Sequence, residues 1–274
     1  MSPGARRAFA ACLAVLCGPR VGAAGVRTAG DDEDPGPIPD KIDEVVEELF
    51  LGRVVYPQDA LALQLTASLV GARAARRTAA ATALEVELGL TDRLQLSAEA
   101  PLEWGTASPE ARGADLGNAA VGALYNPLSD RPRGMALSAG LEVTLPTASR
   151  SGAAAWGVEA FAVAYRTLGR LHANLELGVE LLQPTAPGAE RELAPAGALG
   201  VLAPIGRWVP VLELRGELGA EPAAVASAGT LWHPTGGLEL GAALQLGLDT
   251  APGLDGWSVG GLVIATVELE LAGD

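Results

Sequence analysis

Several residue types are nearly missing from this sequence. It has two cysteines, Cys12 and Cys17, and a single lysine, Lys41, while aromatic residues make up 4% of the chain. Both cysteines lie in the first 24 residues, so the rest of the chain offers neither a disulfide framework nor thiol chemistry. The lack of lysine also counts against a soluble sheet, whose solvent face usually mixes lysine with threonine and glutamate.

The first 24 residues have the pattern of a secretory signal peptide. Arg6 and Arg7 form a positive start, residues 8–18 are a short apolar stretch, and small residues occupy 21–24. Cleavage also removes Arg20, so the loss of three positive charges changes the formal net charge from −14 to −17. An exported chain this acidic is not expected to bind nucleic acid, because phosphate contacts need lysine and arginine.

The rest of the chain alternates between apolar and polar residues in short segments. No uncharged apolar run of about 18 residues is present, which excludes a membrane-spanning helix. Alternation with a period of two predicts β-strands instead. Twelve such segments lie near 60–71, 79–90, 94–104, 115–127, 135–146, 154–167, 171–182, 192–203, 208–219, 224–233, 238–248 and 257–271.

The connections between these segments alternate in length. Short ones are 91–93, 129–134, 169–170, 204–207 and 234–237, and longer ones are 72–78, 105–114, 147–153, 183–191, 220–223 and 249–256. Short turns at one end and longer loops at the other are typical of an outer-membrane barrel, and bacterial barrels have an even number of strands. We therefore predict an all-β, twelve-stranded antiparallel transmembrane barrel over residues 57–274, with both termini at the periplasmic end.

The few aromatic residues lie near strand ends. Trp104, Trp156 and Trp257 fall at the long-loop end, and Tyr125, Tyr165, Trp208 and Trp232 fall at the short-turn end. Aromatic rings favour the two interfacial levels of a membrane, which predicts two girdles. Tryptophan also often marks strand ends in soluble sandwiches, but aromatic residues at both ends of the strands favour the two girdles.

The polar faces of the segments are rich in glutamate. In a membrane barrel the apolar face meets lipid and the polar face meets the lumen. The predicted lumen residues are Glu85, Glu87, Gln95, Glu99, Glu103, Glu142, Glu159, Glu176, Glu180, Glu213, Arg215, Glu217, Glu239, Gln245, Glu268 and Glu270. Such a lining would favour cations over anions. The alternative is a filled lumen in which these charges pair with Arg215 and water, since twelve strands enclose a modest bore.

Residues 25–56 form an acidic N-terminal segment before the barrel. The stretch 31–40, DDEDPGPIPD, is broken by proline and is expected to be extended or disordered. A short amphipathic helix follows, with Ile42, Val45, Val46, Leu49 and Phe50 on one face. Its acids, Asp43, Glu44, Glu47 and Glu48, would be repelled by an acidic lumen. We therefore favour packing on the periplasmic rim over a plug inside the barrel.

Three stretches carry a resemblance to a known family. They read LEVELGLTDRLQLSAEAPLEW (84–104), GADLGNAAVGALYNPLSD (113–130) and MALSAGLEVTLPTA (135–148). The chain resembles the MetA-pathway-of-phenol-degradation family over most of residues 45–271. That resemblance implies an outer-membrane barrel of the transporter type. It implies no catalytic motif.

Enzymatic chemistry has little support in the sequence. His172 and His233 are the only histidines, and neither accompanies a recognisable nucleophile motif. No cluster has metal-ligand spacing, and no calcium or phosphate loop is present. We expect no cofactor and no enzymatic activity.

The sequence therefore favours a porin-like passive channel for an unidentified small solute in the outer membrane of a Gram-negative cell. Its expected partners are outer-membrane lipids and the barrel-assembly machinery. The alternatives are a structural or surface-interaction barrel with an occluded lumen and, third, an outer-membrane hydrolase.

Overall fold

The computed structural model describes residues 49–74, 77–105, 114–149, 154–219, 222–249 and 257–271. Its strands are β1 (Ala62–Ala74), β2 (Arg77–Thr91), β3 (Leu94–Gly105), β4 (Ala114–Leu116), β5 (Ala120–Asp130), β6 (Met135–Thr144), β7 (Ala155–Leu168), β8 (Leu171–Pro184), β9 (Glu192–Leu202), β10 (Trp208–Glu217), β11 (Ala223–Thr235), β12 (Leu238–Asp249) and β13 (Trp257–Glu270). A 3-10 turn, η1 (Arg131–Arg133), follows β5. Within the described ranges no helix is long and apolar enough to cross a membrane.

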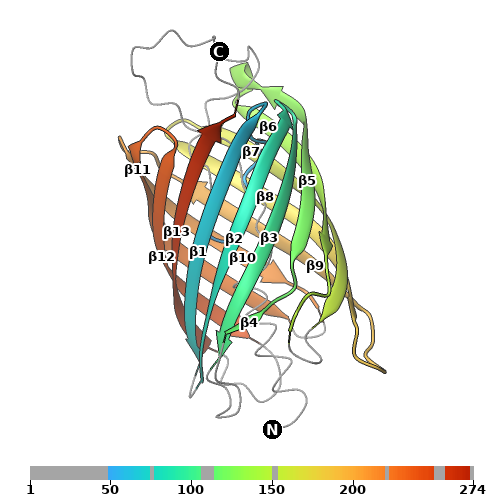
Figure 1. The fold of residues 1–274 in the computed structure, drawn as a ribbon. Coiled ribbons are helices and arrows are strands. Elements are labelled where there is room, and N and C mark those ends of the chain that lie inside the picture. Colours follow the sequence, from blue (N-terminus) through green and yellow to red (C-terminus); the bar gives the residue numbers. More distant parts are fainter. Residues whose placement is uncertain are drawn as a thin grey trace.

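The strands form one closed antiparallel barrel (Figure 1). Consecutive strands pair with each other, except that β4 and β5 both pair with β3. The pairings of β13 with β1 and of β2 with β3 complete the ring. The barrel has twelve strands because β4 and β5 occupy one strand position, both pairing with β3. This position was predicted as a continuous strand over 115–127. It is interrupted between Leu116 and Ala120, opposite Pro101, whose carbonyl accepts a hydrogen bond from Gly117 N.

The side chains alternate between the two faces of the barrel wall. On β8, Glu176 is 1% exposed and points inward, whereas its neighbour Leu177 is 60% exposed and points outward. The same alternation runs along the other strands, with a large set of exposed leucines and valines on the outside. A closed sheet leaves no unpaired edge, so an apolar outer face can meet lipid without exposing backbone polar groups. The twelve-stranded fold and its apolar exterior place this chain in an outer membrane.

The outer face carries the tryptophans at both ends of the barrel. Trp104, Trp156 and Trp257 are exposed near the long-loop end, as is Tyr125 at the short-turn end. Trp208 and Trp232 pair across β10 and β11, with ring centroids 5.6 Å apart and planes 16° from parallel.

Tyr165 is a correction to the predicted girdle. It is 8% exposed and lies inside the barrel, where its ring is 6.3 Å from that of Tyr56. The reason is its register on β7, where Tyr165 is an even number of residues from inward-facing Glu159. The position of Tyr165 near the end of its strand predicted an interfacial ring. The alternation of side chains along the strand instead directs the ring into the barrel.

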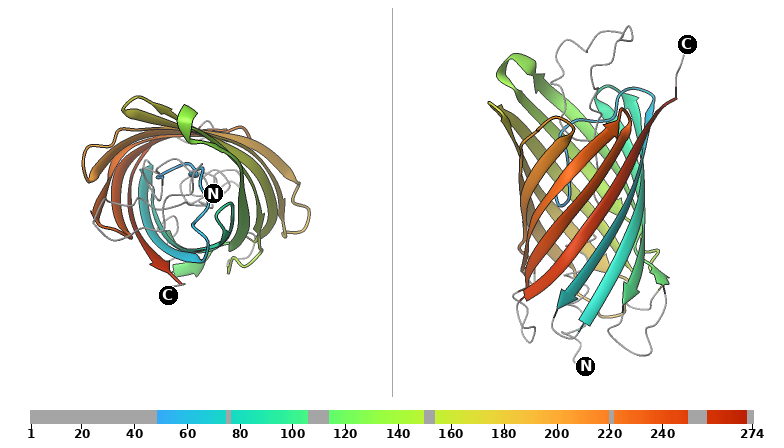
Figure 2. Two further views of the ribbon diagram at one scale, coloured as in Figure 1. Left: turned by 90° about the horizontal axis from the view of Figure 1, so that it is seen from above. Right: turned by 90° about the vertical axis from the view of Figure 1, so that its left-hand side faces the viewer.

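Residues 49–58 are buried inside the ring of strands, so this part of the N-terminal segment does not pack on the rim as predicted. We call residues 49–58 the inner segment, drawn in blue within the barrel in Figure 2. Its Phe50, Arg53 and Tyr56 are each at most 1% exposed. Leu49 and Phe50 are not helical, and the rest of the predicted helix, like residues 1–48 as a whole, falls outside the described residues.

Two local features let the inner segment turn outward into β1. Leu61 has a left-handed φ of 63°, and its N–H donates to the carbonyl of Gly89 on β2 at 2.8 Å. Gly89 permits this close approach because it has no Cβ. A Cβ at that position would lie 1.9 Å from the carbonyl oxygen of Asp59.

We expect Gly89→Ala to separate the inner segment from β2. The clash involves backbone atoms, which cannot yield as a side chain would, so the free energy of unfolding should fall by about 1–3 kcal/mol. Gly71→Ala is the matched control, because nothing lies within 4 Å of a Cβ there. Urea titration of the refolded chains in detergent measures both variants. Equal stability of the two would show that Asp59 does not pass over Gly89.

Candidate functional site

The predicted lumen residues lie on the inward face of the strands. Those that are buried are Glu85, Glu87, Gln95, Glu99, Glu142, Glu159, Glu176, Glu213, Arg215, Glu239 and Gln245. Those that are partly buried, nearer the barrel ends, are Glu103, Glu180, Glu217 and Glu268, while Glu270 at the end of β13 is exposed. The structure therefore gathers carboxylates from most of the strands around one interior.

Strand register brings three of these carboxylates into one row. Glu142 on β6 lies opposite Glu159 on β7, and Glu159 lies opposite Glu180 on β8. Directly opposed side chains in an antiparallel sheet have Cβ atoms about 4.5–5.5 Å apart, and like charges at that distance destabilise the sheet. The row therefore needs a positive charge close to it.

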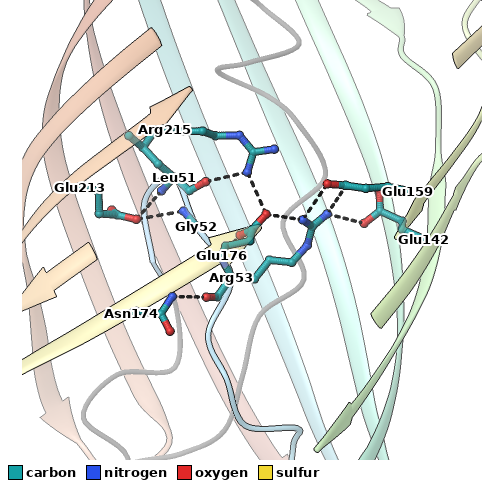
Figure 3. A network of polar contacts seen from close by, with 9 residues as sticks. All are labelled: Leu51, Gly52, Arg53, Glu142, Glu159, Asn174, Glu176, Glu213 and Arg215. Atoms are coloured by element: carbon teal, nitrogen blue, oxygen red, sulfur yellow. Dashed lines mark hydrogen bonds and ion pairs between the residues drawn. The ribbon is translucent and has the colours of Figure 1, made fainter. Parts of the chain in front are cut away.

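Arg53 of the inner segment supplies that charge (Figure 3). Its Nη1 lies 2.6 Å from Glu176 Oε1, and its Nη2 lies 2.7 Å from Glu159 Oε2 and 3.3 Å from Glu142 Oε2. One guanidinium thus bridges carboxylates from β6, β7 and β8. Arginine suits this position because its planar fork presents several donors in fixed directions and stays charged when buried.

An aromatic ring completes the surroundings of Arg53. The Cζ atom of Arg53 lies 4.0 Å from the centre of the Phe161 ring on β7, within the range of a cation–π interaction. Phe161 lies over Gly140 of β6, where a Cβ would come within 2.2 Å of the ring. The glycine therefore leaves the space that the ring needs to lie against the wall.

The backbone of the inner segment also binds the wall. Glu213 on β10 accepts hydrogen bonds from the N–H groups of Phe50, Leu51 and Gly52 at 2.8–2.9 Å. Three N–H donors around one carboxylate form charge-assisted hydrogen bonds, which are stronger than bonds between neutral groups. The carboxylate thus satisfies three consecutive backbone donors that no secondary structure pairs.

Three further contacts hold the segment around Arg53. Glu176 Oε2 accepts a hydrogen bond from Arg53 N at 2.8 Å, and Asn174 Nδ2 donates to Arg53 O at 2.6 Å. Arg215 Nη1 donates to Leu51 O at 3.1 Å and lies 3.4 Å from Glu176 Oε1. Glu176 therefore links the two arginines and the segment backbone.

A second network of polar side chains surrounds Gln58, near the short-turn end of the barrel. Gln58 N donates to Gln95 Oε1 at 2.7 Å, and the Gln58 amide donates to Gln64. Gln64 Nε2 and Gln95 Nε2 both donate to Glu87, the former at 2.8 Å. These side chains come from β1, β2 and β3, so the segment is hydrogen-bonded to opposite sides of the barrel.

Apolar side chains fill the space between these polar contacts. Leu49, Phe50, Leu51 and Val54 pack in a buried cluster with inward residues of β1, β2 and β9–β13. Val55 and Tyr56 pack in a second cluster with residues of β5, β6 and β7, among them Phe161. The inner segment therefore spans the lumen from one wall to the other.

The two histidines have structural surroundings in the lumen. His172 Nδ1 contacts the hydroxyl of Tyr165, and the rings stack with centroids 5.7 Å apart. His233 Nε2 lies 3.3 Å from Glu239 Oε2. In the described part of the chain, no three His, Cys, Asp or Glu side chains are arranged to hold a metal ion.

Sequence reasoning missed Arg53, the residue that organises this site. The available signal was its setting in 49–56, LFLGRVVY, where one charge interrupts an apolar and aromatic run just before the first strand. Such a run is expected to be buried, and a buried arginine requires carboxylate partners. The sequence predicted the wall glutamates but paired them only with Arg215 and water.

Comparison with known proteins identifies the fold. No family model matches this sequence, and no curated protein sequence matches it. An outer-membrane channel from Pseudomonas putida F1 superposes with a TM-score of 0.58 and 14% identity, over 88% of this chain and 100% of that one. The NanC porin gives 0.54 and 14% over 74% and 98% of the two chains, and the KdgM porin 0.50 and 9% over 74% and 98%. The fold is thus that of outer-membrane channels and porins, and the narrower MetA-pathway assignment stays a prediction.

Proposed function

We propose that this chain is an outer-membrane channel for small solutes in which the inner segment forms the constriction. The observation that carries the proposal is an irregular segment held inside a closed barrel by side-chain contacts rather than by strand pairing. A wall that encloses a lumen is suited to passage, and a segment without strand pairing to the wall can leave it. The likeness to channel and porin folds supports the same reading.

The charges of the lumen favour cations. Eight glutamates but only two arginines are buried among the described residues. Rings of carboxylates around a pore raise the local concentration of cations and repel anions. Neutral solutes would pass without this electrostatic preference, so ion selectivity reports the charge of the lumen separately from the width of the passage.

The alternative is a non-transporting barrel whose lumen is permanently occluded. The burial of Phe50, Arg53 and Tyr56 favours it, because these side chains fill the space between opposite walls. Single-channel recording of the refolded chain in planar bilayers separates the two functions. A channel shows openings in the intact chain and larger, more frequent openings when residues 25–58 are deleted. Silence of the intact chain and steady current of the deletion variant would favour the occluded barrel.

We expect the double variant Glu99→Gln and Glu180→Gln to lose part of its cation preference. Both side chains face inward and neutralising them removes two negative charges from the passage, so the reversal potential in a salt gradient should move toward zero. Glu190→Gln is the control, because Glu190 is exposed in the connection between β8 and β9. An unchanged reversal potential in the double variant would contradict a carboxylate-lined path.

A further inference from the structure

We infer that the wall of β6–β8 carries a binding site for small guanidinium-bearing solutes, which Arg53 occupies as an internal competitor. The site consists of Glu142, Glu159 and Glu176 with the ring of Phe161, and we call these four residues the guanidinium cage. This inference rests on the proposed function only for how a solute reaches the cage, since binding itself does not require conduction.

The cage belongs wholly to the barrel wall. Its residues lie on three consecutive strands whose pairing is continuous from Glu142 to Glu159 and along β8. Phe161 lies against Gly140 of β6, where the missing Cβ leaves room for the ring on the wall. Removing Arg53 therefore leaves three carboxylates and an aromatic face in place.

The occupant of the cage identifies the chemistry that it accepts. The guanidinium of Arg53 makes ion pairs with all three carboxylates while its Cζ lies over the ring of Phe161. A planar cation with forked donors satisfies both the carboxylates and the ring face. An ammonium is a compact point charge that stays more strongly hydrated, so it fits the ring and the spread carboxylates less well.

The way Arg53 is held makes competition possible. Arg53 is part of a segment without strand pairing, so its guanidinium can be replaced without breaking the barrel. A tethered group has a high effective concentration, and a free solute must exceed it to displace the tether. A solute that enters the cage would release the side-chain hold on the segment, which couples binding to opening.

The test measures methylguanidinium binding to the refolded full-length mature chain carrying Arg53→Ala. Binding is measured by calorimetric titration in detergent. A second measurement is the temperature at which the compact gel band converts to the unfolded one. We expect saturable binding and a rise in that conversion temperature at millimolar methylguanidinium, far below denaturing concentrations. Methylammonium should bind about tenfold more weakly, equivalent to about 1.4 kcal/mol.

Two further variants keep the test decisive. Adding Glu159→Gln to Arg53→Ala should weaken methylguanidinium binding, whereas adding Glu190→Gln should not, because Glu190 is exposed in the connection between β8 and β9. If Arg53→Ala does not refold, as judged by gel mobility without boiling, Arg53→Gln replaces it, because its neutral amide can still hydrogen-bond to the carboxylates. Absence of saturable binding in a refolded variant, or equal binding of methylammonium, would overturn the cage.

The outcome for the cage is separable from that for the channel. Uptake of methylguanidinium by liposomes containing the wild-type chain measures passage. Binding to the Arg53→Ala variant without uptake by the wild-type chain would support the cage and count against the channel. Uptake without such binding would support the channel and count against the cage.

Discussion

A disulfide bond between positions 52 and 198 should block the channel, and reduction of that bond should restore its current. A Cβ at Gly52 would lie 3.4 Å from the Cβ of Ala198 on β9. That separation is close to the range of about 3.5–4.5 Å found in disulfides. The variant Gly52→Cys, Ala198→Cys therefore ties the inner segment to the wall at its anchored part, next to the N–H groups that bind Glu213. If passage requires the segment to leave, a covalent tie prevents it.

The measurement is single-channel current before and after a reducing agent. The native cysteines do not interfere, because Cys12 and Cys17 both precede the mature chain predicted from the sequence. The control is Thr66→Cys, Thr266→Cys, which links β13 to β1 where the two hydroxyls are 3.1 Å apart. This second bond joins wall to wall and should leave the current unchanged. Equal currents in the oxidised and reduced 52–198 variant would show that solutes pass without displacement of the segment.

Loss of Arg53 should have the largest effect on stability. Arg53→Met removes the only guanidinium that bridges Glu142, Glu159 and Glu176 in the described structure, and leaves those carboxylates close together. Breaking a buried ion pair from one side typically costs about 3–5 kcal/mol, because the remaining charges are desolvated and unpaired. We expect a fall of this size in the free energy of unfolding, measured by urea titration in detergent.

Neutralising the three carboxylates should restore most of the lost free energy of unfolding. Adding Glu142→Gln, Glu159→Gln and Glu176→Gln to Arg53→Met removes the carboxylates that have lost their partner. Replacing a whole buried ion pair often changes the free energy of unfolding little. The control is Arg133→Met, whose ion pair with Asp130 lies at the surface with the Arg133 side chain 76% exposed. It should remain near wild type because surface pairs are screened by water. No recovery in the quadruple variant would mean that Arg53 acts through packing and not through charge.

The strand pattern was readable from the sequence because it depends on near neighbours. Alternation with a period of two fixes which residues share a face, and turns of two or three residues fix where strands reverse. The predicted segments 171–182 and 238–248 correspond to β8 (Leu171–Pro184) and β12 (Leu238–Asp249). The same local rule would have placed Tyr165 inside, since it shares a face with Glu159. The position of Tyr165 along the strand predicted the wrong face, because register decides which face a strand residue occupies.

What the sequence by itself determined is the alternation of the wall, and with it the closed barrel, the apolar exterior and the inward glutamates. Only the tertiary structure decided what those glutamates bind. Arg53 meets Glu142, Glu159 and Glu176 across 89, 106 and 123 residues, and Phe50 meets Glu213 across 163. No local period encodes such partners. They are brought together because neighbouring buried carboxylates are unstable without a positive group, and the inner segment carries the arginine that reaches them.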